Sequence, residues 1–264
     1  MMAIQVAPDI IQVYDLNGGY NGKGKIDIVP STDIGGLQNA TLPLFYGNNP
    51  NTTKDGKKGT LFEIYNLANM EVHFSNFFQG VQQIDVHPSP KSNLMLVRGH
   101  KYVDDTGQSY YGKNTLSLID SECQRLKVIT TYNGPIYNLS WNPNGECFAV
   151  CGGFLPSHTV IYDVKGAPYL VAAKDHKNSI FWSPNGEFIA IAGFGNLNGE
   201  IKIWNLPKKQ QVGKCMHGDA GDLEWAPDGR HFLTKVEFKF LREGNQYRVE
   251  VVNQGLRLSW DTSE

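Results

Sequence analysis

The chain has 264 residues, 24 Lys and Arg against 26 Asp and Glu, and 41% hydrophobic residues. This length and apolar content suffice for a globular core and argue against wholesale disorder. The net charge of −2 gives no general attraction to phosphate backbones, so any nucleic-acid contact needs a local basic patch. No apolar run reaches the roughly 18 residues of a membrane helix, and the start MMAIQVAPDIIQV has no secretory signal. We therefore expect a cytoplasmic protein with no membrane partner.

A two-residue motif recurs along the chain: an apolar or aromatic residue followed by Asp or Asn. The copies are Tyr14-Asp15, Tyr65-Asn66, Ile119-Asp120, Tyr162-Asp163, Trp204-Asn205 and, less clearly, Val252-Asn253. Intervals near 42 residues match the period of a β-propeller blade, and two longer intervals are explained by loop insertions over residues 43–59 and 99–114. We expect an all-β protein, a single propeller domain or fragment over residues 1–264, with blade ends near residues 15, 66, 120, 163, 205 and 253.

The repeat begins in the middle of a blade and stops in VVNQGLRLSWDTSE. This pattern favours five to six blades of a larger propeller, because blades stack on neighbours and the ring must close or be capped.

Two groups of lysines stand out in this weakly charged chain. Lys54, Lys57 and Lys58 lie in the first insertion, and Lys208, Lys209 and Lys214 lie near a later turn. Lysines commonly protect exposed strand edges against mispairing, so solvated edges are the first interpretation. RNA contact is the alternative interpretation for all six.

The second insertion contains the acidic loop VDDTGQSYYG, residues 103–112. Asp104 and Asp105 could in principle bind a cation, but the loop lacks the alternating ligands and terminal glutamate of a calcium loop. Tyr110 and Tyr111 are rigid amphipathic side chains of the kind that interfaces favour. The loop is therefore interpreted either as a solvated insertion or as a partner-binding loop.

One full repeat is legible between residues 179 and 206, SIFWSPNGEFIAIAGFGNLNGEIKIWNL. Trp182 ends a first strand, Pro-Asn-Gly forms a tight turn, and Phe188 begins a buried second strand. EIKIWNL alternates as a third strand should, and KQQVGKCM is an edge strand. Trp141 and Trp225 stand in the same context, so the three tryptophans are expected to pack between four-stranded antiparallel blades.

Signatures of catalysis are not found in the sequence. The cysteines are Cys123, Cys147, Cys151 and Cys215, which are interpreted as buried thiols in a reducing compartment. GFGNLNG, residues 193–199, has the wrong glycine spacing for a nucleotide loop and is expected to connect two strands. We expect no enzyme activity, no cofactor, no metal and no small-molecule substrate.

Several phrases of the sequence resemble the propeller of the eukaryotic translation initiation factor 2A family. They are YVDDTGQSYYGKNTL, NGPIYNLSWNPNGECFAVCGGFLP, AGFGNLNGEIKIWNL and WAPDGRHFLT, and the similarity covers about Gly59 to Gly255. The b subunit of eukaryotic initiation factor 3 has a related propeller and matches the two loop phrases less well.

The resemblance implies a nine-bladed propeller with a basic tail, association with the small ribosomal subunit, and GTP-independent delivery of initiator methionyl-tRNA. Residues 1–40 match poorly and the basic tail has no counterpart here, which places tRNA binding by this chain in question. The candidate partner-binding residues matching the two family loops are Asp104, Asp105, Thr106, Gly107, Gln108, Tyr110, Tyr111, Phe194 and Asn196. For Gly107, Phe194 and Asn196, turn formation and blade packing are the favoured interpretation.

The sequence therefore predicts a non-catalytic propeller platform for translation initiation, with the small ribosomal subunit, initiator methionyl-tRNA and other initiation factors as partners. A generic WD-repeat-type propeller for protein interaction, like that in the b subunit of initiation factor 3, is the alternative. An enzyme with a site in the central channel would need a converging cluster of carboxylates or histidines, which the sequence does not show.

Overall fold

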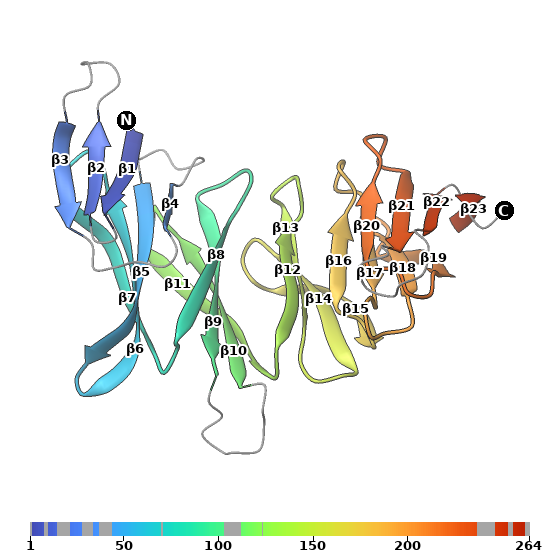
Figure 1. Cartoon of the computed structure of the whole chain (residues 1–264), viewed down its shortest axis with the longest axis horizontal. Coiled ribbons are helices and arrows are strands. Elements are labelled where there is room, and N and C mark those ends of the chain that lie inside the picture. The colour runs from blue at the N-terminus through green and yellow to red at the C-terminus, as the bar shows by residue number, and fades with distance from the viewer. Residues whose placement is uncertain are drawn as a thin grey trace. The chain divides into compact units, whose positions relative to one another are not determined.

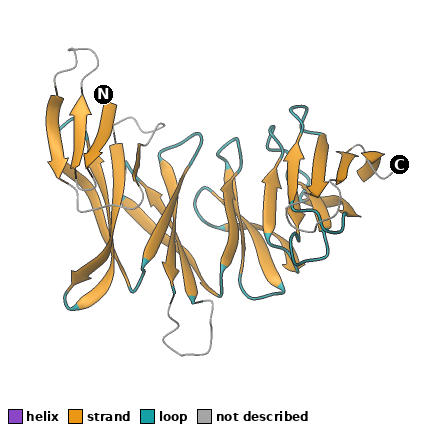
Figure 2. Cartoon of the chain, in the orientation of Figure 1, coloured by secondary structure: helices purple, strands orange, loops and turns teal. Residues whose placement is uncertain are grey.

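The computed structural model describes residues 2–7, 10–14, 22–27, 34–36, 44–69, 71–102, 112–122, 124–236, 246–252 and 256–261. These residues form antiparallel β-sheets and contain no helix (Figures 1 and 2). The chain divides into two compact units, unit 1 over residues 1–133 and unit 2 over residues 134–264. The prediction of an all-β fold built from four-stranded antiparallel blades is confirmed.

Unit 1 contains three sheets. The first has three strands, β1 (Met2–Ala7), β2 (Ile10–Tyr14) and β3 (Gly22–Asp27). The second has four, β4 (Ile34–Gly36), β5 (Leu44–Lys54), β6 (Lys57–Asn66) and β7 (Glu71–Gln79). The third has β8 (Gln83–Pro88), β9 (Leu94–Lys101), β10 (Lys113–Asp120) and β11 (Arg125–Asn133).

Unit 2 contains three four-stranded sheets in chain order. The first has β12 (Ile136–Trp141), β13 (Cys147–Gly152), β14 (Ser157–Asp163) and β15 (Pro168–Asp175). The second has β16 (Ser179–Trp182), β17 (Phe188–Ala192), β18 (Glu200–Asn205) and β19 (Gln210–Met216). The third has β20 (Asp222–Trp225), β21 (His231–Val236), β22 (Gln246–Val252) and β23 (Leu256–Asp261).

The first insertion differs from the prediction. The sequence predicts an inserted loop over residues 43–59, but most of them extend β5 and β6 into a long hairpin that turns at Asp55 and Gly56. Both turn residues have positive φ, 50° and 72°, as a two-residue hairpin turn requires. The Asp-Gly pair is the sequence signal for this turn. Lys54 and Lys57 therefore stand directly opposite each other at the hairpin tip.

The recurring motif has a local structural cause. Its Asp or Asn ends the third strand of a sheet at Asn66, Asp120, Asp163 and Asn205. Each side-chain Oδ1 accepts a backbone N–H from the following turn; for Asp163 the donors are the N–H groups of Lys165 and Ala167, at 2.9 and 2.8 Å. Asx turns of this kind are why Asp and Asn are favoured there. In the two outer copies, Asp15 and Asn253 lie outside the described residues.

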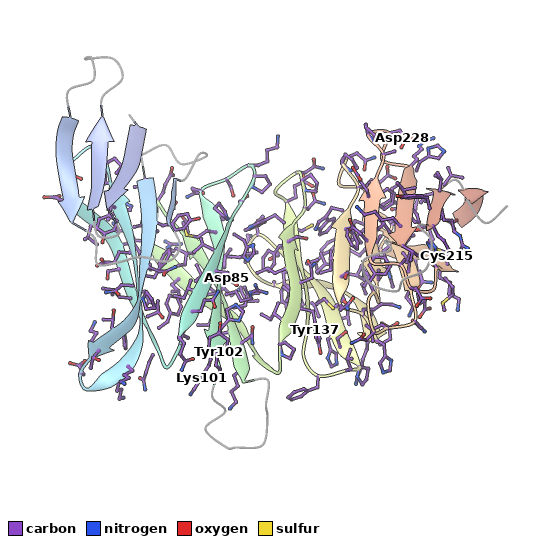
Figure 3. All side chains as sticks on the ribbon, viewed as in Figure 1. Asp85, Lys101, Tyr102, Tyr137, Cys215 and Asp228 are labelled. Carbon is purple, nitrogen blue, oxygen red and sulfur yellow. The ribbon has the colours of Figure 1, made fainter. Side chains whose placement is uncertain are left out.

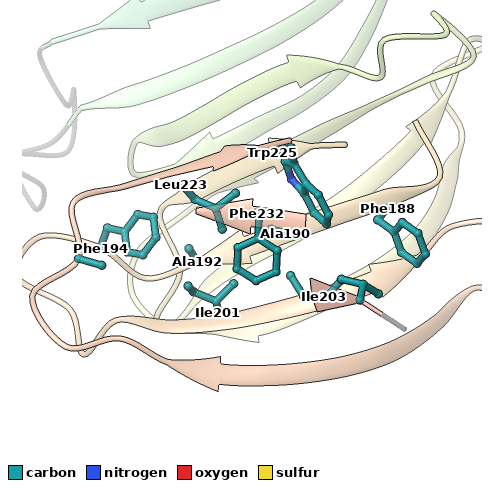
Figure 4. Packing of buried hydrophobic residues seen from close by; sticks show 11 residues of the cluster. Phe188, Ala190, Ala192, Phe194, Ile201, Ile203, Leu223, Trp225 and Phe232 are labelled. Carbon is teal, nitrogen blue, oxygen red and sulfur yellow. The ribbon is translucent and has the colours of Figure 1, made fainter. Parts of the chain in front are cut away.

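Apolar residues of neighbouring sheets interlock within unit 2. Every residue of β17 is buried, so the sheet has apolar neighbours on both faces. Figure 4 shows Phe232 of the next sheet beside Ala190, whose small side chain leaves room for the ring. Trp225 stacks on Phe188 with ring centroids 6.3 Å apart. Each such ring contributes about 1.5–3 kcal/mol of burial energy, and the stack is stable only because both sheets are present.

The repeated tryptophans also join sheets through hydrogen bonds. Trp182 donates its indole N–H to Ser140 Oγ at 2.8 Å, and Trp225 donates to the carbonyl of Phe181 at 3.2 Å. Each bond runs from the end of a first strand to the first strand of the preceding sheet. Residues about 42 apart in sequence therefore meet in space, which explains the spacing of the tryptophans.

Candidate functional site

Antiparallel strands sort the connections of each unit into two groups. In each four-stranded sheet, the second and third strands are connected at the end where the first strand starts and the fourth strand finishes; we call this the loop end of that unit. The first-to-second and third-to-fourth connections lie at the opposite end, which we call the turn end (Figure 1). Within a unit, candidate residues can therefore contribute to one binding site only if they lie at the same end, either the loop end or the turn end.

The first predicted partner-binding loop lies between β9 and β10. Asp104, Asp105, Thr106, Gly107, Gln108, Tyr110 and Tyr111 all lie outside the described residues. Both flanks of this loop are at the loop end of unit 1, where Gly112 has a φ of 63° and a Cβ there would lie 1.9 Å from the carbonyl oxygen of Lys101. Only glycine fits this flank. The partner-binding role of the loop stays a prediction.

The second predicted loop, residues 193–199, connects β17 and β18 at the loop end of unit 2. Phe194 is only 3% exposed and packs against Phe181, with ring centroids 5.8 Å apart. Asn178 clamps the loop, since its Oδ1 accepts the Phe194 N–H at 3.0 Å and its Nδ2 donates to the Phe194 carbonyl at 2.9 Å. Asn196 is exposed. The loop is therefore held by a core ring and presents Asn196 to solvent.

The six candidate RNA-contact lysines are divided equally between the two units. Lys54, Lys57 and Lys58 are exposed at the loop end of unit 1. In unit 2, Lys208 and Lys209 lie in the β18–β19 turn at the turn end, at the opposite end of β18 from Asn196. The Lys209 ammonium lies 3.8 Å from the centroid of the Tyr169 ring. The third member of this group, Lys214, lies within β19 opposite Lys202.

Three residues near the first group were missed by sequence reasoning. Lys101 and Lys113 pair directly across β9 and β10 at the loop end of unit 1, and Tyr102 follows Lys101. Figure 3 shows Asp85, Tyr102 and Lys101 in succession toward this end. Lys54 and Lys101 are far apart in the sequence, so only strand register reveals their common location. The β-strand pattern of LMLVRGHK was the sequence signal that could have placed Lys101 at the end of a strand.

A polar cluster fixes the strands that lead to Tyr102. Asp85 Oδ2 accepts hydrogen bonds from Arg98 Nε at 3.0 Å and, where the imidazole nitrogen carries the proton, from His100 Nε2 at 2.7 Å. Burial alone would raise the pKa of Asp85, but the hydrogen bonds and charges of His100 and Arg98 outweigh it and lower the pKa. The carboxylate therefore stays ionised and holds both side chains on the β8–β9 face.

A second charged cluster lies at the loop end of unit 2. Lys177 is only 1% exposed, and its ammonium lies 3.0 Å from Glu200 Oε2 and 3.1 Å from the Glu200 carbonyl oxygen. Asp175 Oδ2 lies 4.0 Å from the same ammonium and also pairs with Lys202. Two lysines and two carboxylates therefore balance one another, and the cluster connects the β12–β15 sheet to the β16–β19 sheet.

A cavity of about 370 Å³ opens at the turn end of unit 2, lined among others by Glu146, Cys147, Tyr169 and Glu187. Burial raises the pKa of the Cys147 thiol to about 12, so no reactive thiolate is available at neutral pH. Among the described residues, no group of three or more His, Cys, Asp or Glu is placed to hold a metal ion. The cavity has no pairing of a nucleophile with a base in its described lining.

Successive four-stranded antiparallel sheets that stack as blades define the class of protein: a β-propeller-type scaffold. A family model described as "Eukaryotic translation initiation factor eIF2A" matches residues 75–258. The chain belongs to this family, and the predicted resemblance is confirmed.

Relatives in animals illustrate the match. Eukaryotic translation initiation factor 2A of Caenorhabditis elegans is 35% identical over 160 residues, which are 60% of this chain and 28% of that protein. The Drosophila melanogaster factor 2A is 28% identical over 245 residues, 89% of this chain and 38% of that protein. The B subunit of eukaryotic translation initiation factor 3 from Xenopus laevis is 35% identical over 117 residues, 42% of this chain and 17% of that protein. The chain therefore spans about a third of the length of the factor 2A relatives.

A solved structure described as "Crystal structure of the eukaryotic initiation factor" superimposes with a TM-score of 0.79, covering 99% of this chain and 62% of that chain. The sequence identity is 19%, so this likeness establishes the fold alone. In the part of the chain that the structure describes, no helix is long and apolar enough to cross a membrane.

Proposed function

We propose that this chain is a non-catalytic, cytoplasmic propeller platform that presents its loops to the small ribosomal subunit during translation initiation. The single observation that carries the proposal is the family match over residues 75–258, which includes the β8–β22 strands. By family, the platform takes part in delivery of initiator methionyl-tRNA and contacts other initiation factors. We further propose that residues 1–264 form a single propeller domain or fragment, and that it is part of a nine-bladed ring.

The geometry supports a platform because one of its candidate loops, residues 193–199, is held in place by the sheet beneath it. The 193–199 loop uses Phe194 as a buried anchor and Asn178 as a clamp, which leaves Asn196 exposed without loosening the backbone. A preorganised loop loses little conformational entropy when it binds, so its contacts contribute more fully to affinity. Phe194 serves this site as support, and Asn196 is its candidate contact residue.

Co-sedimentation with purified small ribosomal subunits at moderate salt tests the proposal. We expect the chain in the pellet with ribosomal particles and in the supernatant without them. Asn196→Ala and the double change Tyr110→Ala, Tyr111→Ala should weaken pelleting, and the exposed Lys91→Gln, at the turn end of unit 1, is the matched control. A wild-type chain that remains in the supernatant would point to an interaction scaffold outside translation.

The match to the B subunit of initiation factor 3 favours one alternative, an interaction scaffold of the kind found in that factor. Gel filtration with purified initiation factor 3 and no ribosomes separates the two functions. Co-migration with factor 3, together with no binding to small ribosomal subunits alone, would favour the alternative. Binding to these ribosomal particles in the absence of factor 3 supports the factor 2A platform.

A further inference from the structure

We propose that the loop end of unit 1 is a binding site for the phosphate backbone of single-stranded RNA, with Tyr102 as a stacking platform for a base. The site combines the β5–β6 hairpin tip with the adjoining ends of β9 and β10. The choice of RNA as the anion rests on the proposed function in translation. The more general requirement, a ligand that carries a row of negative charges and a flat group that can stack on Tyr102, follows from the side chains described below.

The hairpin tip has a like-charge arrangement that the fold itself does not require. Lys54 and Lys57 are directly opposite partners of the ladder, and Thr53 is opposite Lys58. Like charges directly opposite each other destabilise a sheet. All three lysines are exposed, and none of them forms an ion pair with a described residue, not even with Asp55 between them. A bound anion would relieve this repulsion.

Hydrogen-bond donors accompany the lysines. Lys54 and Lys57 line a hollow of about 330 Å³ that is also lined by Asp55, Ser75, Asn76, Phe77 and Gln79. The side-chain amides of Asn76 and Gln79 form no hydrogen bond within the described part of the chain. Amide N–H groups beside lysines are the usual donors to phosphate oxygens. Two lysine charges against the one carboxylate of Asp55, together with directed donors, therefore suit the hollow to successive phosphate groups of a strand.

Further lysines extend the positive charge to the neighbouring sheet. Lys101 and Lys113 are direct partners across β9 and β10. The Lys58 carbonyl accepts the Gly80 N–H at 2.9 Å, and a Cβ at Gly80 would lie 3.4 Å from the Lys101 ammonium. Because Gly80 has no side chain, Lys101 can reach toward the second sheet. Lys58 and Lys101 therefore meet at Gly80 from the two sheets, and Lys54, Lys57 and Lys113 lie at the same end of unit 1.

Tyr102 adds the feature that distinguishes nucleic acid from a generic anion. Its ring stacks on His100 with centroids 6.1 Å apart and planes 19° from parallel, yet the side chain is 58% exposed. Its backbone N–H bonds to Gln82 Oε1 at 3.0 Å and its hydroxyl bonds to Gln83. A fixed, exposed ring beside lysines is the arrangement by which proteins stack bases of single strands. An acidic peptide would use the lysines but not the ring.

Fluorescence anisotropy with a labelled oligouridine of about 15 nucleotides tests the site directly, without ribosomes. Each phosphate contact adds about 0.7 to the slope of log affinity against log salt. We expect K54Q/K57Q to lower the slope by about 1.4 and to weaken binding about 25-fold at about 0.1 M salt. K58Q/K113Q should act alike, and the four changes together should lower the slope by about 2.8.

The control is K91Q/K174Q, which removes two exposed lysines elsewhere and matches the change in net charge. Its slope should equal that of the wild type. The inference is overturned if the wild type binds no oligouridine at low salt, or if K54Q/K57Q and K91Q/K174Q give the same slope. Thermal unfolding of each variant confirms that the sheets are intact.

Tyr102 separates RNA from an acidic protein partner. Tyr102→Ala should weaken oligouridine binding at least fivefold at every salt concentration with no change in slope, while Tyr102→Phe should retain affinity. Polyglutamate is the competing probe. If polyglutamate binds as tightly as oligouridine and Tyr102→Ala affects neither, the site serves an acidic protein and the RNA assignment is wrong.

The outcome is distinguishable from that of the proposed function. A chain that pellets with small ribosomal subunits but shows no lysine-dependent oligouridine binding would retain the platform and lose this site. A chain that binds oligouridine through these lysines but does not pellet would retain the site and lose the platform.

Discussion

Lysines gather at the loop ends of both units, but their surroundings differ. In unit 2, Lys177 and Lys202 are balanced by Asp175 and Glu200, and Lys177 is almost completely buried. In unit 1, Lys54 and Lys57 are exposed and form no ion pair with a described residue. Buried lysines that have carboxylate partners hold sheets together, whereas exposed lysines without partners are available to an external anion. Whether a lysine stabilises the fold or can bind an external anion therefore depends on its surroundings and not on the number of lysines nearby.

Removing a paired lysine should give the largest effect. Lys177→Ala leaves Glu200 without its buried counter-charge, and we expect the free energy of unfolding to fall by about 3–5 kcal/mol. Urea unfolding measures this change. Lys174→Ala on the exposed side of β15 is the control and should cost less than about 0.5 kcal/mol. Equal losses in the two variants would contradict a supporting role for Lys177.

Backbone constraint at the same end of unit 2 can be tested with two glycines of similar φ. Gly199 has a φ of 72°, and a Cβ there would lie 1.9 Å from the His217 carbonyl oxygen. Gly195 has a φ of 69° and open space around it. Gly199→Ala should destabilise by about 3 kcal/mol, and Gly195→Ala by about 1 kcal/mol for the left-handed backbone alone. The melting temperatures of the two variants measure the difference. Similar losses would show that the backbone near Gly199 moves to accommodate the added Cβ.

Acid should weaken the paired carboxylate of unit 1. The pKa of Asp85 is lower in the folded protein, so its stabilisation is complete above the unfolded pKa of about 3.9 and is lost as pH falls through the folded pKa. Asp85→Asn should therefore cost about 1–2 kcal/mol at pH 7, with the difference from wild type shrinking below about pH 4. Denaturant unfolding at several pH values measures this. A constant difference down to about pH 2 would refute the assignment.

The smallest effect is expected at the unpaired lysines. Lys54→Gln removes the like-charge pair with Lys57 and should stabilise the chain by about 0.2–0.5 kcal/mol at low salt. High salt should abolish the gain, because these exposed charges are screened. Differential scanning calorimetry at two salt concentrations is sufficient. Destabilisation by Lys54→Gln at low salt would mean that the lysine supports the fold.

Much of the architecture was predictable because local chemistry repeats. Asp163 and Asn205 end third strands by accepting turn N–H groups, and this short-range bond leaves a visible motif. Long-range placement was less accessible. The extension of β5 and β6 in place of a loop depended on pairing between two polar segments whose composition suggests a loop.

The candidate site was predictable only in part. Phe194 was recognised within a family phrase, and its burial against Phe181 depends on the sheet beneath the loop. Tyr102 and Lys113 lie within a family phrase and Lys101 directly precedes it, but the phrase does not mark these three residues as parts of a binding site. Their location at the same end of unit 1 as Lys54 follows from the order and register of two sheets, information that no window of the sequence contains.

By itself, the sequence determined the all-β class, the blade period and the family, because turn-forming residues and alternating apolar residues act over a few positions at a time. The tertiary structure alone decided which lysines are supporting and which are exposed. That distinction depends on whether a carboxylate from another strand or sheet lies within a few ångströms, and electrostatic energy depends on that distance and not on separation along the chain.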